Sequence, residues 1–472
     1  MAAAQSQSLS ELIETYLESN PSIPRDDKTT SELEVKFGTL GVKPLTRMDY
    51  DNVVNELYNH GFVSNNAGGE TFLRIQNEYL DPSSGRTKIS NVRCQISSVE
   101  AIQKYCKTNS VDKIPDSLLS FEQKMDVQRA EKVYYRPSDN KDFNFRTTLK
   151  YEKQLSKQSP IIRDLVSDWS NKKKTFRLIN RVSFTHTSYP VSIELSIVKS
   201  SRRSRSGMIP EYTIESSNVL NDVENYEIEI EVINMKTGSG TPWTRSNLDE
   251  FTTMLKNNVK IVLSGLQQTH YPISYPEQSN VIQSYMHLIN DKDYESRRVV
   301  PKDFIGPSSL TLQISNIAPL NEDAVIPNVR VNYTVTDKAD GLRKLLYVHK
   351  SGKIYLIDTN MNVQYTGAVT KKEDLVETLL DGEHILHNKK GEFINLYAAF
   401  DVYFVPSKNE ITSYQTSDSF EFYSQDGCYA KNYHSFSGIC ENVGKDSGLL
   451  IVLPDSLESS LTKVKISIHE KL

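Results

Sequence analysis

Residues 338–343 read KADGLR and combine a lysine, an aspartate and a glycine at a spacing that could support covalent catalysis. Lys338 follows residues 331–336, whose alternation of side chains predicts a β-strand. The ε-amine of a lysine in this position could attack the α-phosphate of a nucleotide and hold the nucleoside monophosphate on its side chain. A K-x-D-G tetrapeptide also arises by chance as an exposed turn before a strand, so other segments must decide between the two interpretations.

Two later segments favour catalysis. Residues 379–385, LLDGEHI, and residues 396–404, LYAAFDVYF, are hydrophobic strands with carboxylates at their ends. Together with the lysine segment they follow the order of motifs I, III and IIIa of the covalent nucleotidyltransferases, and the chain resembles this family of mRNA guanylyltransferases and polynucleotide ligases. Residues 304–307, 334–337 and 362–367 are similar to segments of the capping enzymes of large cytoplasmic DNA viruses, such as poxviruses, asfarviruses and mimiviruses.

This resemblance implies that the second half of the chain binds GTP and transfers GMP through a lysyl intermediate. The attacking amine must be neutral, and nearby cations in a partly dry pocket favour the neutral form. Arg343 and Lys344 could act in this way, whereas Asp337 and Asp340 oppose them. The implied roles are Lys338 as nucleophile, Asp340 and Gly341 as its turn, Arg343 on sugar or phosphate, Glu383 on ribose or metal, Phe400 stacked on guanine, and Asp401 at the strand end.

The family pattern continues with further motifs and an OB-fold lid, which the C-terminal residues match poorly. Residues 445–451 contain an additional serine relative to the next motif, and the K-x-K pair Lys463 and Lys465 lies close to Leu472. We therefore expect a partial guanylyltransferase domain lacking the OB-fold, and little or no GMP labelling of Lys338 in this chain. The methyltransferase of the longer relatives is expected as a separate domain or subunit.

The first half contains two strands whose glutamates fall on alternate positions. In residues 31–38 and again in residues 226–232, glutamates occupy one face and apolar residues the other. Each strand alone is typical of a sheet edge with solvated carboxylates. Two such clusters favour a shared counter-ion, and Mg²⁺ or Mn²⁺ is the natural candidate because hard divalent cations bind carboxylate oxygens. The candidate metal ligands are Glu32, Glu34, Glu227, Glu229 and Glu231.

Basic residues alternate in the same way between these two strands. An all-β region with acids on its outer strands and bases between them can close into a barrel with a charged interior and an apolar exterior covered by helices. Such an interior suits metal-assisted hydrolysis of a polyphosphate, since bases neutralise the phosphates while glutamates hold the metal. The candidate interior residues are Arg93, Lys124, Arg146, Lys150, Glu152, Arg177, Arg181 and Lys199.

The pattern resembles the triphosphate tunnel metalloenzymes, specifically the RNA 5′-triphosphatases of viral and fungal capping enzymes. The resemblance implies that the two glutamate strands ligate the metal, that the bases hold the γ-phosphate, and that Glu152 helps to position the attacking water. Glu194 stands where the family usually has aspartate. Glu194 and Lys199 differ in parity, so an ideal strand cannot turn both of them inward.

An amphipathic helix is expected between the two halves. Residues 247–269 carry apolar side chains at intervals of three and four, Ser246 could begin the helix, and the proline-bearing stretch 270–276 marks a boundary. The expected architecture is α+β: an antiparallel triphosphate-tunnel barrel over residues 1–270, followed by a partial nucleotidyltransferase domain over residues 271–472.

Composition limits the partners of the chain. Of 472 residues, 38% are hydrophobic and 24% charged, and the net charge of −5 argues against sequence-blind coating of nucleic acid while allowing a local basic groove. We expect neither a membrane span nor secretion, and free thiols at the four cysteines, which form no C-x-x-C pair. Basic clusters at residues 172–174 and 202–205 are expected to be exposed loops that attract RNA modestly.

Three functions compete on this basis. The leading hypothesis is mRNA capping in the host cytoplasm or the virion, by a metal-dependent triphosphatase acting on 5′-triphosphate RNA and a guanylyltransferase segment using GTP. An ATP-dependent polynucleotide ligase shares the lysine motif but needs no glutamate-rich barrel. A non-catalytic assembly fragment is compatible with the second half alone, and a small-molecule triphosphatase with the first half alone.

Overall fold

The structure is a computed structural model, in which the chain forms two compact units, residues 1–268 and 269–472. The division lies two residues before the boundary placed from the sequence. Among the described helices, none is long and apolar enough to span a membrane. The residues described are 8–19, 29–41, 43–129, 133–205, 207–236, 240–290, 297–306, 311–319, 328–330, 340–405, 412–413 and 450–452.

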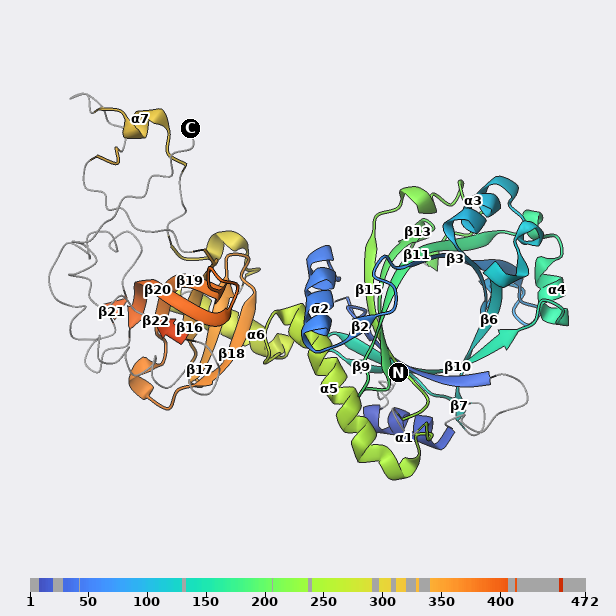
Figure 1. Cartoon of the computed structure of the whole chain (residues 1–472), viewed down its shortest axis with the longest axis horizontal. Coiled ribbons are helices and arrows are strands. Elements are labelled where there is room, and N and C mark those ends of the chain that lie inside the picture. Colours follow the sequence, from blue (N-terminus) through green and yellow to red (C-terminus); the bar gives the residue numbers. More distant parts are fainter. Residues whose placement is uncertain are drawn as a thin grey trace. The chain divides into compact units, whose positions relative to one another are not determined.

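Eight antiparallel strands close into a barrel in the first unit, as the alternating sequence pattern predicts (Figure 1). Around the ring each strand pairs with the next in the order β1–β10–β6–β5–β3–β11–β12–β15, and β15 pairs with β1. The strands are β1 (Thr29–Phe37), β3 (Glu70–Leu80), β5 (Val92–Ser97), β6 (Leu119–Asp126), β10 (Phe145–Leu155), β11 (Lys174–Thr185), β12 (Val191–Ser200) and β15 (Asn225–Val232).

Helices and short strands surround this barrel. In Figure 1, α1, α2 and α5 lie on one side of the ring, and α3 and α4 on the other. The helices are α1 (Leu9–Ser19), α2 (Arg47–Asn59), α3 (Val99–Thr108), α4 (Pro160–Val166) and α5 (Leu248–Gln267). The short strands are β2 (Val63–Ser64), β4 (Thr87–Ile89), β7 (Gln128–Arg129), β8 (Val133–Tyr134), β9 (Ser138–Asn140), β13 (Arg203–Ser204) and β14 (Gly207–Met208).

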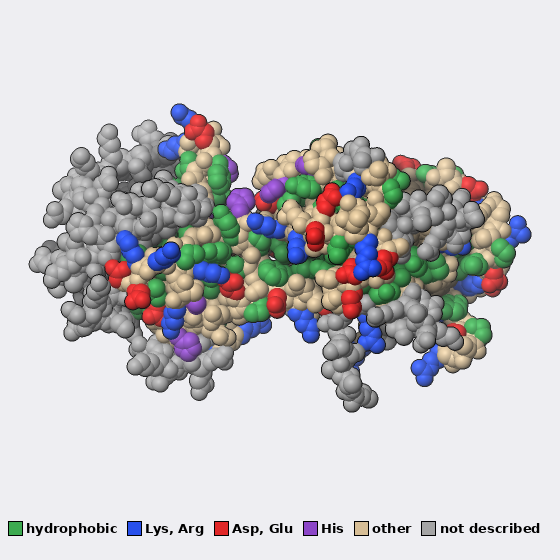
Figure 2. All heavy atoms as spheres, turned by 90° about the horizontal axis from the view of Figure 1, so that it is seen from below, with side chains coloured by type: hydrophobic (Ala, Val, Ile, Leu, Met, Phe, Trp, Pro, Cys, Tyr) green, Lys and Arg blue, Asp and Glu red, His purple; other side chains and the backbone are tan. Residues whose placement is uncertain are grey.

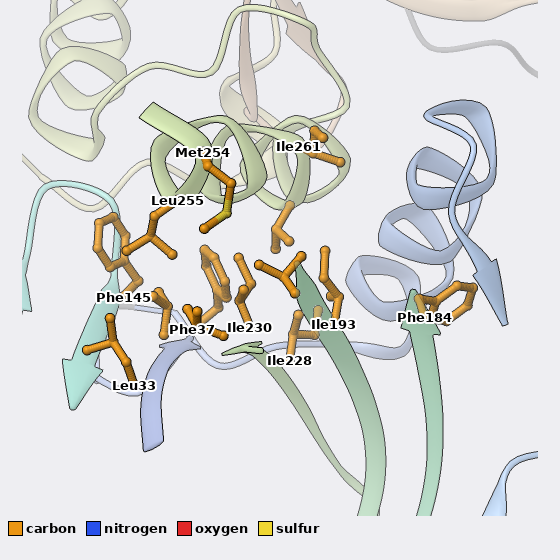
Figure 3. Close-up of a cluster of buried hydrophobic side chains, with 14 of the residues drawn as sticks. Leu33, Phe37, Phe145, Phe184, Ile193, Ile228, Ile230, Met254, Leu255 and Ile261 are labelled. Carbon is orange, nitrogen blue, oxygen red and sulfur yellow. The ribbon is translucent and has the colours of Figure 1, made fainter. Parts of the chain in front are cut away.

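The outer faces of the strands supply the core. On β1, Leu33 and Phe37 are buried beneath α5, where Met254 and Leu255 cover them (Figure 3). Removing one such side chain from water contributes about 1.5–3 kcal/mol. Because successive residues of a strand point to opposite faces, burying these odd positions outside turns the even positions of β1 into the barrel.

A second cluster of buried residues covers the opposite side. Leu73 and Ile75 of β3 pack with Tyr105 of α3 and Phe176 of β11. The described cysteines, Cys94 and Cys106, are free thiols, as expected, while the other two cysteines lie outside the described residues. On the face drawn in Figure 2, acidic and basic side chains are interspersed, in keeping with the small net charge.

The second unit contains a sheet in the order β18–β17–β16–β19–β20–β21, with β22 parallel to β20. Residues of α6 pack on one face of this sheet, and a separate apolar cluster lies around Leu346 and Leu380. The two carboxylate-bearing strands expected from the sequence are β19 and β20. The elements are α6 (Tyr275–Asn290), α7 (Ile314–Ile317), β16 (Leu342–Val348), β17 (Lys353–Asp358), β18 (Val363–Val369), β19 (Leu379–His387), β20 (Phe393–Val405), β21 (Thr412–Ser413) and β22 (Leu450–Val452).

Candidate metal and phosphate site

Three carboxylates from two neighbouring strands meet inside the barrel. Glu32 and Glu34 of β1 and Glu152 of β10 each place one oxygen within 4.8 Å of the others. The β1–β10 register pairs Glu32 with Lys150 and Glu34 with Thr148, so all these side chains share the interior face. Thr148 Oγ1 also donates a hydrogen bond to Glu34 Oε2 at 3.3 Å.

Lys124 of β6 lies between these carboxylates. Its Nζ is 2.5 Å from Glu32 Oε2 and 3.0 Å from Glu152 Oε1, and it also pairs with Glu34. Although the ammonium is close, Glu32 Oε2 is buried and accepts no hydrogen bond of acceptable geometry. Lys36 Nζ also lies 2.9 Å from Glu34 Oε2, so the cluster already accommodates two ammonium groups and still leaves Glu32 Oε2 without a hydrogen bond.

The pKa values of the three acids differ because they are buried together. Burial and the neighbouring Glu34 raise the pKa of Glu32 to about 11. Burial opposes ionisation of Glu34 as well, but the hydrogen bond from Glu32 and the charges of Lys36 and Lys124 lower its pKa. Hydrogen bonds from Glu122 and Glu32 lower the pKa of Glu152 to about 2 against the effect of its burial.

This donor set fits a hard divalent cation. Mg²⁺ and Mn²⁺ take carboxylate oxygens, and a charge of +2 would neutralise acids that the ammonium groups of Lys36 and Lys124 leave partly protonated. Glu32, Glu34 and Glu152 are the residues that would hold it. The first two were expected as ligands from the sequence, whereas Glu152 was expected to position water.

The glutamates of β15 face the same interior but have different partners. Glu229 pairs with Lys36 at 3.0 Å and with Arg181 at 3.8 Å, and Glu227 accepts two hydrogen bonds from Arg177 at 2.6 and 2.7 Å. No described lysine or arginine forms an ion pair with Glu231. Burial and the neighbouring acids raise the pKa of Glu231 to about 7.

Four arginines face the interior from three adjacent strands. Burial and the charges of Arg93, Arg181 and Arg177 lower the pKa of Arg74 to about 10. The Nε atoms of Arg74 and Arg177 are buried and make no hydrogen bond. Mutually repelling guanidinium groups with unused donors are suited to bind an anion such as a polyphosphate.

Arg74 was not identified from the sequence. It alternates with Leu73 and Ile75 in β3, and this period-2 pattern is the signal that could have found it. The ring of Phe72 lies 5.6 Å from the guanidinium of Arg74 and 5.6 Å from that of Arg181, which fixes both groups against the barrel wall.

Three predicted interior residues do not join the cluster. Lys199 is a correction: the β11–β12 register pairs it with Leu178 on the outer face, and its Nζ contacts Leu220 O at 3.5 Å. Lys150 pairs with Asp126. Arg146 donates to Asp139 at 2.6 and 2.9 Å, beside a cavity of about 820 Å³ that residues 136–142 help to line.

The parity conflict within β12 is therefore resolved in favour of Glu194. Its Cα is paired with that of Glu229 on the interior face, and its carboxylate pairs with Arg181. Burial raises the pKa of Glu194 against the effect of Arg181. Arg93, in turn, lies 3.9 Å from Glu152 at the edge of the carboxylate cluster.

The predicted nucleotide site in the second unit is only partly described. Lys338 and the side chain of Phe400 lie outside the described residues. A Cβ on Gly341 would lie 2.6 Å from His384 O and 2.8 Å from Glu383 Cγ, so only glycine allows this approach to β19. Glu383 itself is half-buried.

Arg343 has a protein partner in this unit. It donates from Nε and Nη2 to the fully buried Asp381, at 3.1 and 2.5 Å, and Tyr403 donates to the same carboxylate at 2.6 Å. Asp401 lies within β20 rather than at its end, and its Oδ1 accepts a hydrogen bond from the adjacent Val402 N at 2.8 Å. The contact of Arg343 with sugar or phosphate stays a prediction.

The fold and the site define a charged antiparallel barrel joined to a sheet unit with nucleotidyltransferase-like motifs. Residues 273–429 match the family model "mRNA capping enzyme, catalytic domain". The chain is 29% identical over 180 residues to a "Probable mRNA-capping enzyme" of Acanthamoeba polyphaga mimivirus, which is 38% of this chain and 12% of that protein. The resemblance to mRNA capping enzymes stated from the sequence is thereby confirmed.

Two solved structures are similar to the chain. The mimivirus capping enzyme triphosphatase has 16% identity and a TM-score of 0.33, covering 54% of this chain and 95% of that one. The S. pombe Pct1 RNA triphosphatase has 13% identity and a TM-score of 0.29, covering 55% and 94%. The description of this chain as a barrel depends on the pairing of its own strands and not on these two structures.

Proposed function

We propose that the first unit removes the γ-phosphate from 5′-triphosphate RNA during mRNA capping, with a divalent metal ion as cofactor. The observation that carries the proposal is the convergence of Glu32, Glu34 and Glu152 within 4.8 Å in the same barrel interior as four inward-facing arginines. Acids without the arginines would suit a cation alone, and arginines without the acids would suit any anion. Their combination suits a metal-bound polyphosphate.

Each group has a distinct part in this reaction. A cation held by the three glutamates would neutralise charge on the phosphate oxygens as the bond breaks. Arg74 and Arg177 would bind the phosphate oxygens through donors that are otherwise unused. Water attacks the γ-phosphorus, the bond to the β–γ bridging oxygen breaks, and inorganic phosphate and RNA 5′-diphosphate are released.

Phosphate release from γ-labelled 5′-triphosphate RNA tests this proposal. Release should require Mg²⁺ or Mn²⁺, and Glu32→Gln and Glu34→Gln should each abolish it while preserving side-chain volume. Glu100→Gln, at an exposed position of α3, is the matched control and should retain activity. Metal-independent release, or full activity in both interior variants, would show the proposal to be wrong.

For the second unit we propose GMP transfer through a covalent nucleotide on Lys338, as the matched family model supports. Incubation with α-labelled GTP or ATP separates this from a ligase-like activity. Little labelling is expected from this chain, and any label retained after denaturation should come from GTP and should be lost in Lys338→Arg. Label from ATP alone would favour the ligase.

The remaining proposals concern cellular context. Capping of viral transcripts would place the protein in the host cytoplasm or the virion. A methyltransferase domain or subunit would act on the capped product. Both proposals depend on the proposed activity, so they would be withdrawn if the release assay showed no phosphate release.

A further inference from the structure

Two basic clusters that the proposed reaction does not use lie at the same end of the barrel. We call the end at which β1 finishes the Gly38 mouth. Because neighbouring strands are antiparallel, β11 begins and β12 finishes there, so residues 172–174 and 202–205 emerge side by side. The strand ends at this mouth are Phe37, Phe145, Asp126, Val92, Leu80, Lys174, Ser200 and Asn225.

Backbone hydrogen bonds fix the two segments to each other. Ser201 N donates to Phe176 O at 2.9 Å, and Lys174 N donates to Glu211 O at 2.8 Å. Ile209 N donates to Arg202 O at 2.8 Å, which closes the β13–β14 hairpin onto the strand end. These bonds hold the two segments in one arrangement. Lys174 is not exposed as predicted, because its side chain is buried and its Nζ donates to Trp169 O and Lys172 O, so Lys173 is the exposed lysine of this cluster.

The side chains on this surface are available to a ligand. Arg202, Arg203 and Arg205 are exposed, and no described carboxylate forms an ion pair with any of them. Tyr212 is 49% exposed, and Lys173 Nζ lies 5.5 Å from the centre of its ring. We define the mouth surface as Lys173, Arg202, Arg203, Arg205 and Tyr212.

Cations inside the barrel also lie toward the same mouth, interspersed with acids. On β1, Lys36 is nearer to it than Glu32, and on β10, Lys150 is nearer than Glu152. Arg177 lies only three residues from the start of β11. Asp126 ends β6 at the same mouth and pairs with Lys150, and Glu227 near the start of β15 pairs with Arg177. The unpaired positive charge at this mouth therefore belongs to the exposed arginines of residues 202–205.

We propose that the mouth surface binds the phosphodiester backbone of the RNA nucleotides that follow the 5′-triphosphate. The inference depends on the proposed function and extends it from the reacting end to the RNA body. Unpaired guanidinium groups and an exposed aromatic ring with a lysine over it are groups with which proteins hold single-stranded RNA, through phosphate contacts and base stacking. A nucleoside triphosphate has no such body and would not reach this surface.

A kinetic comparison tests the proposal. In Arg202→Ala/Arg203→Ala/Arg205→Ala, KM for a short unstructured 5′-triphosphate RNA should rise by about tenfold at 50 mM salt, while KM for ATP hydrolysis should stay within about twofold. Each lost phosphate contact removes about 0.7 from the slope of log affinity against log salt, so the triple variant should lose about 2. The paired variant Lys256→Ala/Lys260→Ala, on the exposed face of α5, is the matched control and should behave as the unchanged protein.

Direct binding keeps this test separate from catalysis. Fluorescence anisotropy with a labelled 5′-hydroxyl RNA of the same sequence needs no phosphate release, and the triple variant should bind it more weakly than the control. Tyr212→Ala should also weaken RNA binding, whereas Tyr212→Phe should retain it because the aromatic ring is kept. Equal RNA affinity in the triple variant and the control would overturn the inference, and so would an equal rise in KM for RNA and ATP. Absence of phosphate release in the unchanged protein would contradict the proposed function alone.

Discussion

Lys124 and Glu32 form an ion pair of 2.5 Å although a whole strand, β10, separates their strands in the barrel wall. Both side chains lie on the interior face of the barrel, and they meet over β10 inside it. The pair places a positive charge among acids that the chain gathers from residues 32, 34 and 152. A divalent cation entering this cluster would compete with that ammonium and free it for a phosphate.

Metal binding should therefore stabilise the first unit. At a concentration 100 times its Kd, Mg²⁺ or Mn²⁺ contributes about 2.7 kcal/mol, or about 5–10 °C in Tm for a unit of this size. Tryptophan fluorescence reports this unit selectively, because Trp169 and Trp243 both belong to it. Glu32→Gln should abolish the metal-dependent shift, and Glu100→Gln should retain it. An unchanged shift in Glu32→Gln would remove that residue from the ligand set.

Glu152 has two candidate roles, and one substitution distinguishes them. Its oxygen lies with those of Glu32 and Glu34, which favours metal binding. Glu152→Gln should therefore raise the metal concentration needed for half-maximal phosphate release by about 10-fold or more. If it only orients water, kcat would fall while the metal requirement stayed constant. Titrating Mn²⁺ against initial rate measures both quantities.

Arg74 should matter more for phosphate release than for stability. Its buried guanidinium is repelled by three others and makes no hydrogen bond through Nε. Arg74→Met should reduce phosphate release by about 100-fold while leaving the free energy of unfolding unchanged or about 1 kcal/mol higher. Lys199→Met, on the outer face of the same barrel, should affect neither. Loss of stability in Arg74→Met without loss of activity would show that Arg74 is structural.

Alternation along single strands was sufficient to predict the barrel and most of its interior. Glu32 and Glu34 share a face because a strand repeats every two residues, and the apolar residues between them need the helix-covered exterior. The same rule showed that Glu194 and Lys199 could not both face inward. It could not say which one would, because that depends on the β11–β12 register.

The sequence pattern could not predict which side chains from different strands meet inside the barrel. Glu152 meets Glu32 and Glu34 only because β10 pairs with β1 in one register over a long separation in the chain. Arg74 is a single basic residue in a strand rich in apolar side chains, so its charge becomes significant only when ring closure brings Arg177 beside it. Long-range pairing, and not local propensity, decides these neighbours.

A buried histidine makes the second unit sensitive to acid. Lys344 Nζ donates to His384 Nδ1 at 2.9 Å, so His384 Nε2 is the donor to Asn395 Oδ1 at 2.8 Å and the ring is neutral. Burial and the charge of Lys344 lower the pKa of His384 to about 4. Between about pH 6.5 and pH 4 the unfolded chain binds the additional proton, so the free energy of unfolding falls as the pH is lowered through this range.

The loss should reach about 2 kcal/mol at pH 5 relative to pH 7. Hydrogen exchange of peptides from β16 and β19, corrected for the intrinsic effect of pH, measures it in the full chain. His384→Gln removes the titrating group and should flatten the dependence, although it lowers stability at pH 7 by breaking one buried hydrogen bond. An equally steep dependence in His384→Gln would mean that another group controls the acid sensitivity of this sheet.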